Sequence, residues 1–153
     1  MTSSERAAVR ELITRHEGYR RTPYHCTAGK LTIGVGRNLD DVGIDQEEAR
    51  YLLDRDIGRA LDDLSSFGWF HVLDTVRQRA LIDMRFQLGP AGFRTFGRMI
   101  AALARQDYAT AATEALDSKW ARFDTPARAQ TIAAMLRSGD VSGDPLVVAQ
   151  LGD

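Results

Sequence analysis

The segment that decides the fold begins Glu17-Gly18-Tyr19 and ends Leu31-Thr32-Ile33-Gly34-Val35-Gly36. β-prone residues and closely spaced glycines alternate in it, which is typical of short strands joined by tight turns. The pattern predicts a small β-hairpin or meander between Gly18 and Asp41, with a turn at residues 27–30. No other part of the sequence predicts a convincing sheet.

Helical spacing of apolar residues flanks this segment on both sides. Upstream, Thr2 and Glu5 have the spacing of a capping box and predict a helix from about residue 3 to residue 16. Downstream, an apolar stripe between Ala49 and Leu64 predicts a long helix that connects two lobes. Further helices are expected at about residues 76–88, 93–103, 108–116 and 127–136.

Capping residues mark the ends of two of these helices. Asp74 is an N-cap type for the first, and Gly89-Pro90 is expected to stop it. Thr125 is the expected N-cap of the last helix, with Pro126 at its first position. An irregular segment is expected from residue 138 to the end.

The composition is that of an ordinary soluble globular protein: 153 residues, 44% apolar and 27% charged. It excludes a disordered tail, a coiled coil and a membrane protein, and the start lacks a secretory signal. Twenty basic residues against 21 acidic ones argue against bulk nucleic-acid binding. The single cysteine, Cys26, excludes an intrachain disulfide, and the three histidines are not spaced like a metal site.

Glu17 is the first candidate for chemistry because it ends a predicted helix. The helix dipole disfavours a negative charge there and favours the protonated carboxyl group that a general acid requires. On position alone, a solvated surface glutamate is the more frequent interpretation.

Four segments together resemble the phage-type lysozymes, the T4 lysozyme-like endolysin family (glycoside hydrolase family 24). The first runs from Glu17 through Tyr24 to the string Thr32-Ile33-Gly34-Val35-Gly36. The others follow in the family's order, at residues 80–89, 91–93 and 118–129. The resemblance covers roughly residues 5 to 140.

The resemblance implies an α+β, mainly helical fold: a lysozyme-like domain of two lobes over residues 1–153. A small β-sheet lobe together with the long connecting helix, at about residues 14–64, would be followed by a helical C-terminal lobe, residues 65–153. Residues 1–13 would pack on the C-terminal lobe. The cleft between the lobes would hold the active site.

The resemblance also assigns catalytic roles. Glu17 matches the family's general acid, which protonates the glycosidic oxygen between N-acetylmuramic acid and N-acetylglucosamine in peptidoglycan. Thr32 matches a catalytic threonine whose hydroxyl holds the attacking water. Its alternative is a plain β-branched strand residue.

Cys26 departs from the family, most members of which have an aspartate there. Its thiolate would hydrogen-bond the water or stabilise the oxocarbenium-like state, and His25, Arg20 or Arg21 are candidates to lower the pKa of the thiol. The alternatives are a covalent nucleophile and a small buried bystander. Asp40 or Asp41 would supply the missing negative charge only in a less favoured scheme.

The C-terminal lobe supplies the expected substrate-binding residues Phe86, Gln87 and Arg128. Arg128 matches a position beside the catalytic glutamate, and Gln87 would hydrogen-bond Trp120 or Arg128. Phe86 is nearly as compatible with core packing, and Trp120 is more often a core residue.

A structural ion pair is expected between Arg37, which replaces the family's usual histidine, and Asp54 on the long helix.

The function implied is a peptidoglycan muramidase, an endolysin for host cell lysis, without metal or organic cofactor. The chain is expected to be a monomer without membrane insertion, made in the host cytoplasm and released by a holin to act on the wall in the periplasm. Two rivals remain: a lytic transglycosylase, and a catalytically inactive wall-binding relative.

Overall fold

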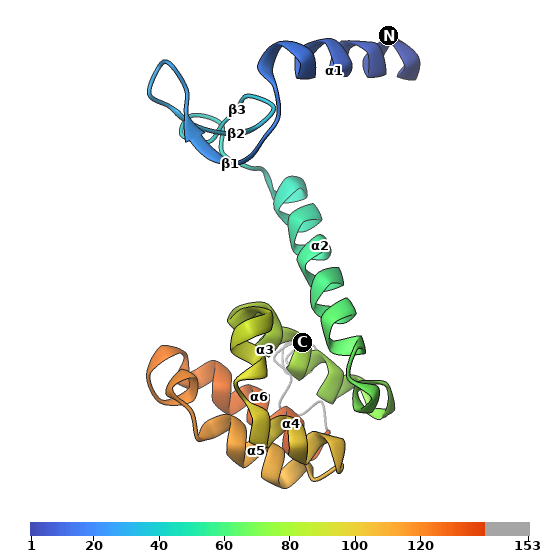
Figure 1. The fold of residues 1–153 in the computed structure, drawn as a ribbon, viewed down its shortest axis with the longest axis vertical. Coiled ribbons are helices and arrows are strands. Elements are labelled where there is room, and N and C mark those ends of the chain that lie inside the picture. Colours follow the sequence, from blue (N-terminus) through green and yellow to red (C-terminus); the bar gives the residue numbers. More distant parts are fainter. Residues whose placement is uncertain (140–153) are drawn as a thin grey trace, which may run out of the picture. The chain divides into compact units, whose positions relative to one another are not determined.

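A computed structural model of the chain describes residues 1–139, and the fold is mainly helical with one small sheet among those residues, as predicted (Figure 1). The chain divides into two compact units, Met1–Leu52 and Leu53–Asp153. The predicted lobe boundary at residue 64 and the packing of residues 1–13 stay predictions. The irregular segment expected at the C-terminus lies, from residue 140, outside the described residues.

The first unit begins with helix α1, Ser3–Glu17, which starts with the predicted capping box. The Thr2 N–H donates to Glu5 Oε2 at 2.5 Å, and the Glu5 N–H donates to Thr2 Oγ1 at 3.2 Å. The helix ends at Gly18, where φ is +72°. None of its residues is buried, and the capping box and Gly18 mark its two ends.

The predicted sheet is antiparallel and has the strand order β1-β2-β3. Its strands are β1, Arg20–His25, β2, Leu31–Gly34, and β3, Arg37–Asn38. The turn between β1 and β2 lies where the sequence placed it. There the Gly29 N–H donates to the Cys26 carbonyl at 2.8 Å, and the Cys26 N–H donates to the Lys30 carbonyl at 3.0 Å.

The long predicted helix is α2, Gln46–Ser65. The prediction of an ion pair between Arg37 and Asp54 is wrong. Arg37 Nη2 instead donates to Glu48 Oε2 at 2.7 Å, and Arg37 Nε donates to the Gly43 carbonyl at 2.9 Å. The loop before α2 brings the first turn of the helix, rather than its middle, within reach of Arg37.

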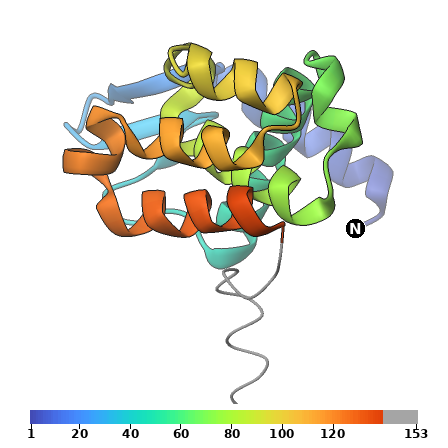
Figure 2. The same cartoon turned by 90° about the horizontal axis from the view of Figure 1, so that it is seen from below.

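The second unit is built from the end of α2 and the helices that follow it, in which α5 and α6 lie side by side (Figure 2). These elements are η1, Gly68–Val72, α3, Thr75–Arg94, α4, Gly97–Ala104, α5, Tyr108–Leu116, η2, Trp120–Asp124, and α6, Pro126–Ser138. Their inner faces form one hydrophobic core, whose largest fully buried side chains are Phe93, Leu64, Leu81, Met84, Met99, Leu103, Ile132 and Leu136.

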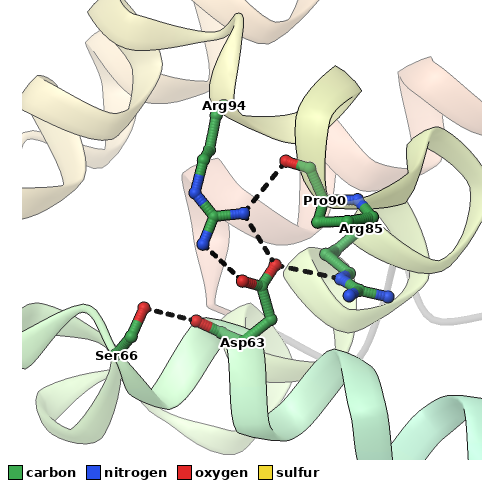
Figure 3. Close-up of polar contacts among 5 residues, drawn as sticks. All are labelled: Asp63, Ser66, Arg85, Pro90 and Arg94. Atoms are coloured by element: carbon green, nitrogen blue, oxygen red, sulfur yellow. Dashed lines mark hydrogen bonds and ion pairs between the residues drawn. The ribbon is translucent and has the colours of Figure 1, made fainter.

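The stop predicted at Gly89 is a break inside α3. Gly89 has φ +69° and ψ 171°, and helical geometry resumes after it. Asp63, near the end of α2, ties both sides of this break together (Figure 3). Its carboxylate accepts from Arg85 Nε at 3.1 Å and from Arg94, which also donates to the Pro90 carbonyl at 3.1 Å.

One helix starts later than predicted, and α6 starts at Pro126 after Thr125 as predicted but without the expected side-chain cap. The helix predicted from Phe93 begins at Gly97, because the chain bends at Thr95 and Phe96 after α3. Thr125 precedes α6 but makes no side-chain cap, since its hydroxyl is engaged with Gln87 instead. Within residues 1–139, no helix is long and apolar enough to cross a membrane.

Candidate active site

Glu17 lies against a glycine of the turn between β2 and β3. A β-carbon built on Gly36 would stand 3.0 Å from Glu17 Oε2 and 3.3 Å from its carboxyl carbon. Gly36 also has φ +71°, a conformation that side-chain-bearing residues rarely adopt. The sequence motif thus serves two needs at this position: it makes the turn, and it leaves room for the carboxyl group at the end of α1.

Thr32 is the buried polar residue of the site, with 4% of its surface exposed. It lies in β2, where it pairs with Tyr24 of β1 and Asn38 of β3. Its hydroxyl donates to the Lys30 carbonyl at 3.0 Å. The hydroxyl oxygen also has lone pairs that can accept a hydrogen bond from another group.

Cys26 begins the turn after β1 as a free, half-buried thiol. The backbone N–H of Lys30 and then that of Ala28 lower the pKa of this thiol, since both donate to sulfur; desolvation opposes them, and the Thr32 side chain adds to the lowering. These groups, rather than the basic side chains of His25, Arg20 or Arg21, stabilise the thiolate. The sequence predicted that neighbouring cations would lower the pKa of Cys26, whereas backbone groups of the turn lower it.

The two aspartates considered as substitutes have structural partners. Asp40 Oδ2 accepts from the Leu31 N–H at 2.9 Å. Asp41 forms an ion pair with Lys30 at 2.8 Å and accepts from Asn38 Nδ2 at 2.9 Å. Both carboxylates close the loop after β3 over the start of β2, which agrees with leaving them out of the catalytic group.

In the second unit, Phe86 and Arg128 line the same pocket, of about 410 Å³, between α2, α3 and α6. Phe86 is 42% exposed and is therefore not a core residue, while its contact with substrate stays a prediction. Arg128 Nε donates to Asp83 Oδ2 at 3.1 Å, and the pair shares the pocket wall. Sequence reasoning missed Asp83, although it stands three residues before Phe86 and therefore on the same side of α3. The role of Arg128 beside Glu17 stays a prediction.

Gln87 turns toward the core instead of the pocket. Trp120 Nε1 donates to Gln87 Oε1 at 3.0 Å, which confirms the predicted link, and Gln87 Nε2 donates to Thr125 Oγ1 at 3.1 Å. Trp120 is 4% exposed and belongs to the core, as the sequence favoured. Substrate contact by Gln87 stays a prediction.

Among residues 1–139 no group of three or more His, Cys, Asp or Glu side chains is placed to hold a metal ion. The first unit therefore brings together a carboxyl group at the end of α1, the Thr32 hydroxyl on β2, and the Cys26 thiol, whose pKa is lowered, in the turn before β2. Glycosidases use a carboxyl group as the acid, together with groups that bind the attacking water.

Comparison with known proteins supports this class. The family model for phage lysozyme matches residues 14–137, and the chain belongs to the phage lysozyme family. The match includes every candidate catalytic and substrate-binding residue named above.

Relatives from different settings are similar over most of this chain. An endolysin of Acyrthosiphon pisum secondary endosymbiont phage 1 is 34% identical, over 80% of this chain and 82% of its own. A Dictyostelium discoideum protein named "Probable T4-type lysozyme 1" is 22% identical, over 89% and 97%. The pre-baseplate central spike protein Gp5 of Enterobacteria phage T4 is 27% identical over 88% of this chain, which spans only 28% of that protein.

Proposed function

We propose that this protein is a muramidase that hydrolyses the β-1,4 bond between N-acetylmuramic acid and N-acetylglucosamine in peptidoglycan. The observation that carries the proposal is the grouping around β2. The Glu17 carboxyl group lies against Gly36 after this strand, Thr32 lies in the strand, and Cys26 lies in the turn before it, where its N–H donates to the Lys30 carbonyl. Assignment to glycoside hydrolase family 24 belongs to the same proposal.

Glu17 acts as the general acid. Its proton passes to the glycosidic oxygen as the bond to the muramic acid C1 breaks, and the leaving sugar departs as an alcohol. The Gly36 contact supports this role because it restricts the position of the carboxyl group within the first unit.

Thr32 and Cys26 assist the attacking water. The Thr32 oxygen accepts a hydrogen bond from the water through one of its lone pairs. The Cys26 thiolate accepts the second water proton and provides negative charge near the oxocarbenium-like sugar. The backbone N–H groups that lower the pKa of Cys26 support this role, because they enlarge the thiolate fraction at neutral pH.

The biological role we propose is host cell lysis. The chain would be a monomeric endolysin that accumulates in the host cytoplasm, is released by a holin and acts on the wall from the periplasm. The similarity to a phage endolysin over 82% of that protein supports this setting more strongly than the similarity to about a quarter of a spike protein. Phe86, Gln87 and Arg128 are proposed to contact the substrate.

The test is to identify the ends that the wild-type protein makes in purified peptidoglycan by mass spectrometry. Reducing muramic acid ends are expected. Anhydro-muramyl ends would instead establish a lytic transglycosylase, and binding to sacculi without fragments would establish a wall-binding protein.

Variants at position 26 separate the roles of sulfur. If the thiolate serves as a charged helper, Cys26→Asp retains hydrolysis and Cys26→Ser loses more of it. Loss in both variants, together with a thioglycoside trapped on wild-type Cys26, would replace the water mechanism by a covalent one.

A further inference from the structure

The nearly neutral net charge conceals a strong segregation along the chain. Residues 1–37 contain seven Arg and Lys residues against three Glu. Residues 38–65 contain nine Asp and Glu residues against three Arg. The part of the first unit that carries the candidate catalytic residues is therefore basic, although the whole protein is not.

Internal ion pairs neutralise some of these cations. Arg15 pairs with Glu11 at 3.2 Å, Lys30 with Asp41 at 2.8 Å, and Arg37 with Glu48. Arg20 and Arg21, at the start of β1, have no ion pair within the described part of the chain, and both are exposed. They are adjacent cations on an edge strand, available to a ligand.

A ring contact distinguishes these two arginines. Arg20 pairs with Gly34 and Tyr24 pairs with Thr32, and the register of β1 against β2 shifts between the two pairs, which brings the Arg20 side chain to Tyr24. The Arg20 guanidinium confirms this placement, because it lies 4.3 Å from the centroid of the Tyr24 ring. Arg21 is the next residue along the strand and lies within the shifted part of the register.

The surroundings of Arg20 suit an incoming anion. A guanidinium stacked on a ring uses its flat face and keeps the N–H donors at its edge, in the fork that matches a carboxylate. Its cross-strand neighbour is Gly34, and a β-carbon built there would meet nothing within 4 Å. The face beside Arg20 is therefore open, and the ring holds the guanidinium in one place.

We propose that Arg20 is a specificity residue that binds a carboxylate of the peptides attached to the glycan strand. The inference rests on the proposed function, since it concerns the substrate of the same site. Peptidoglycan differs from uncharged glycans such as chitin by these peptide carboxylates, so a cation stacked on Tyr24, the cross-strand partner of Thr32, selects for them. Arg21, for which the structure gives no such ring contact, takes no part in this recognition.

The experiment compares two substrates and three variants. Native peptidoglycan is tested beside the same material with its carboxylates converted to amides, which removes the charge and keeps the peptides. Arg20→Ala is expected to lose about tenfold in kcat/KM on native peptidoglycan, mainly through KM, as for one charge-assisted hydrogen bond. It should change less than about twofold on the amidated material.

Arg21→Ala is the matched control, since it removes the same charge from the neighbouring position. It is expected to stay within about twofold of the wild type on both substrates. Arg20→Lys should recover part of the loss, because it restores the charge without the fork. Equal losses for Arg20→Ala on both substrates, or an equal loss for Arg21→Ala, would overturn the proposal.

Binding separates this inference from the proposed function. Glu17→Gln protein, with and without Arg20→Ala, is sedimented with native and with amidated sacculi. Weaker binding of the double variant to native sacculi alone supports the Arg20 site even if the wild type cleaves neither substrate, an outcome that refutes the muramidase. Equal binding of both proteins to native sacculi contradicts the Arg20 site whatever the activity.

Discussion

The two units of this protein are stabilised in different ways. All the buried hydrophobic residues of residues 1–139 belong to the second unit, from Ala60 to Leu136. In the first unit the buried side chain is that of Thr32. The candidate catalytic residues thus lie in the unit without a hydrophobic core, while the core lies in the unit that carries none of them.

The first unit depends on local interactions instead. Its geometry rests on a capping box, on glycines with positive φ at its turns, and on side chains that hydrogen-bond nearby backbone groups. Such interactions fix individual atoms without contributing much to global stability. The comparison teaches that substitutions in the two units should affect different measurements: activity in the first and stability in the second.

The largest expected effect is a loss of stability in the second unit. Phe93 is fully buried, and the centroid of its ring lies 6.2 Å from that of the Phe67 ring. Phe93→Ala should lower the free energy of unfolding by about 3–5 kcal/mol, measured by urea denaturation. Phe123→Ala, at a position 74% exposed, is the control and should cost less than about 0.5 kcal/mol. Similar losses in both variants would mean that the core is not where the structure places it.

The Asp63 cluster should give the next largest effect. Asp63→Asn weakens bonds to Arg85 and Arg94 and should cost about 2 kcal/mol of stability at neutral pH. Asp56→Asn, which removes an exposed partner of Arg59, should cost under about 0.5 kcal/mol. An equal cost for the two variants would show that the cluster does not hold the break in α3.

The same cluster predicts an acid dependence. The hydrogen bond from Arg94 is the main cause that holds the pKa of Asp63 below its ordinary value. Its stabilisation is therefore complete above the unfolded value, about pH 4, and is lost as the pH falls through the lower folded value. Urea denaturation in this acid range should give a smaller pH dependence for Asp63→Asn than for the wild type; equal slopes would contradict the assignment.

A glycine pair sharpens the comparison within the first unit. Gly36→Ala strains the backbone and displaces the Glu17 carboxyl group, so peptidoglycan hydrolysis should fall about tenfold. Gly43→Ala carries the same kind of strain at φ +63°, with nothing within 4 Å of its β-carbon. Both should lose comparable stability, whereas only Gly36→Ala should lose activity. Comparable activities would remove the evidence that Gly36 positions Glu17.

The smallest effect concerns the thiol. Alkylation of Cys26 by iodoacetamide should reach half its maximal rate at a lower pH than for a free cysteine, because the turn lowers the pKa of Cys26. Thr32→Val removes one of the stabilising groups and should move the midpoint upward. Thr22→Val on the exposed strand β1 should leave it unchanged. If Thr32→Val does not change the midpoint, the Thr32 side chain does not stabilise the Cys26 thiolate.

Local features of this fold were predictable from sequence. The capping box at Thr2, the turn at residues 27–30 and the interruption at Gly89 each depend on a few neighbouring residues, and all are confirmed. The positions of Glu17, Cys26 and Thr32 around one small sheet followed from the motif, whereas their catalytic roles stay proposals.

Interactions between distant segments were not predictable in the same way. The sequence offers both Glu48 and Asp54 as acidic partners for Arg37. The fold of the loop to α2 decides that the partner is Glu48. The hydroxyl of Thr125 forms a hydrogen bond with Gln87, 38 residues away, and does not cap the helix that it precedes. The Asp63 cluster joins residues 22 and 31 positions apart, and no periodicity in the sequence encodes such a contact.

The most direct test of the account measures activity and stability together in Glu17→Gln. Because Glu17 is exposed and its unit has no core, the account predicts an unchanged thermal unfolding curve. It also predicts that the release of reducing ends from peptidoglycan falls by about 10²–10⁴-fold, the contribution of a general acid. Release within a few-fold of the wild type by a folded Glu17→Gln protein would contradict the central claim that the chemistry resides in the first unit.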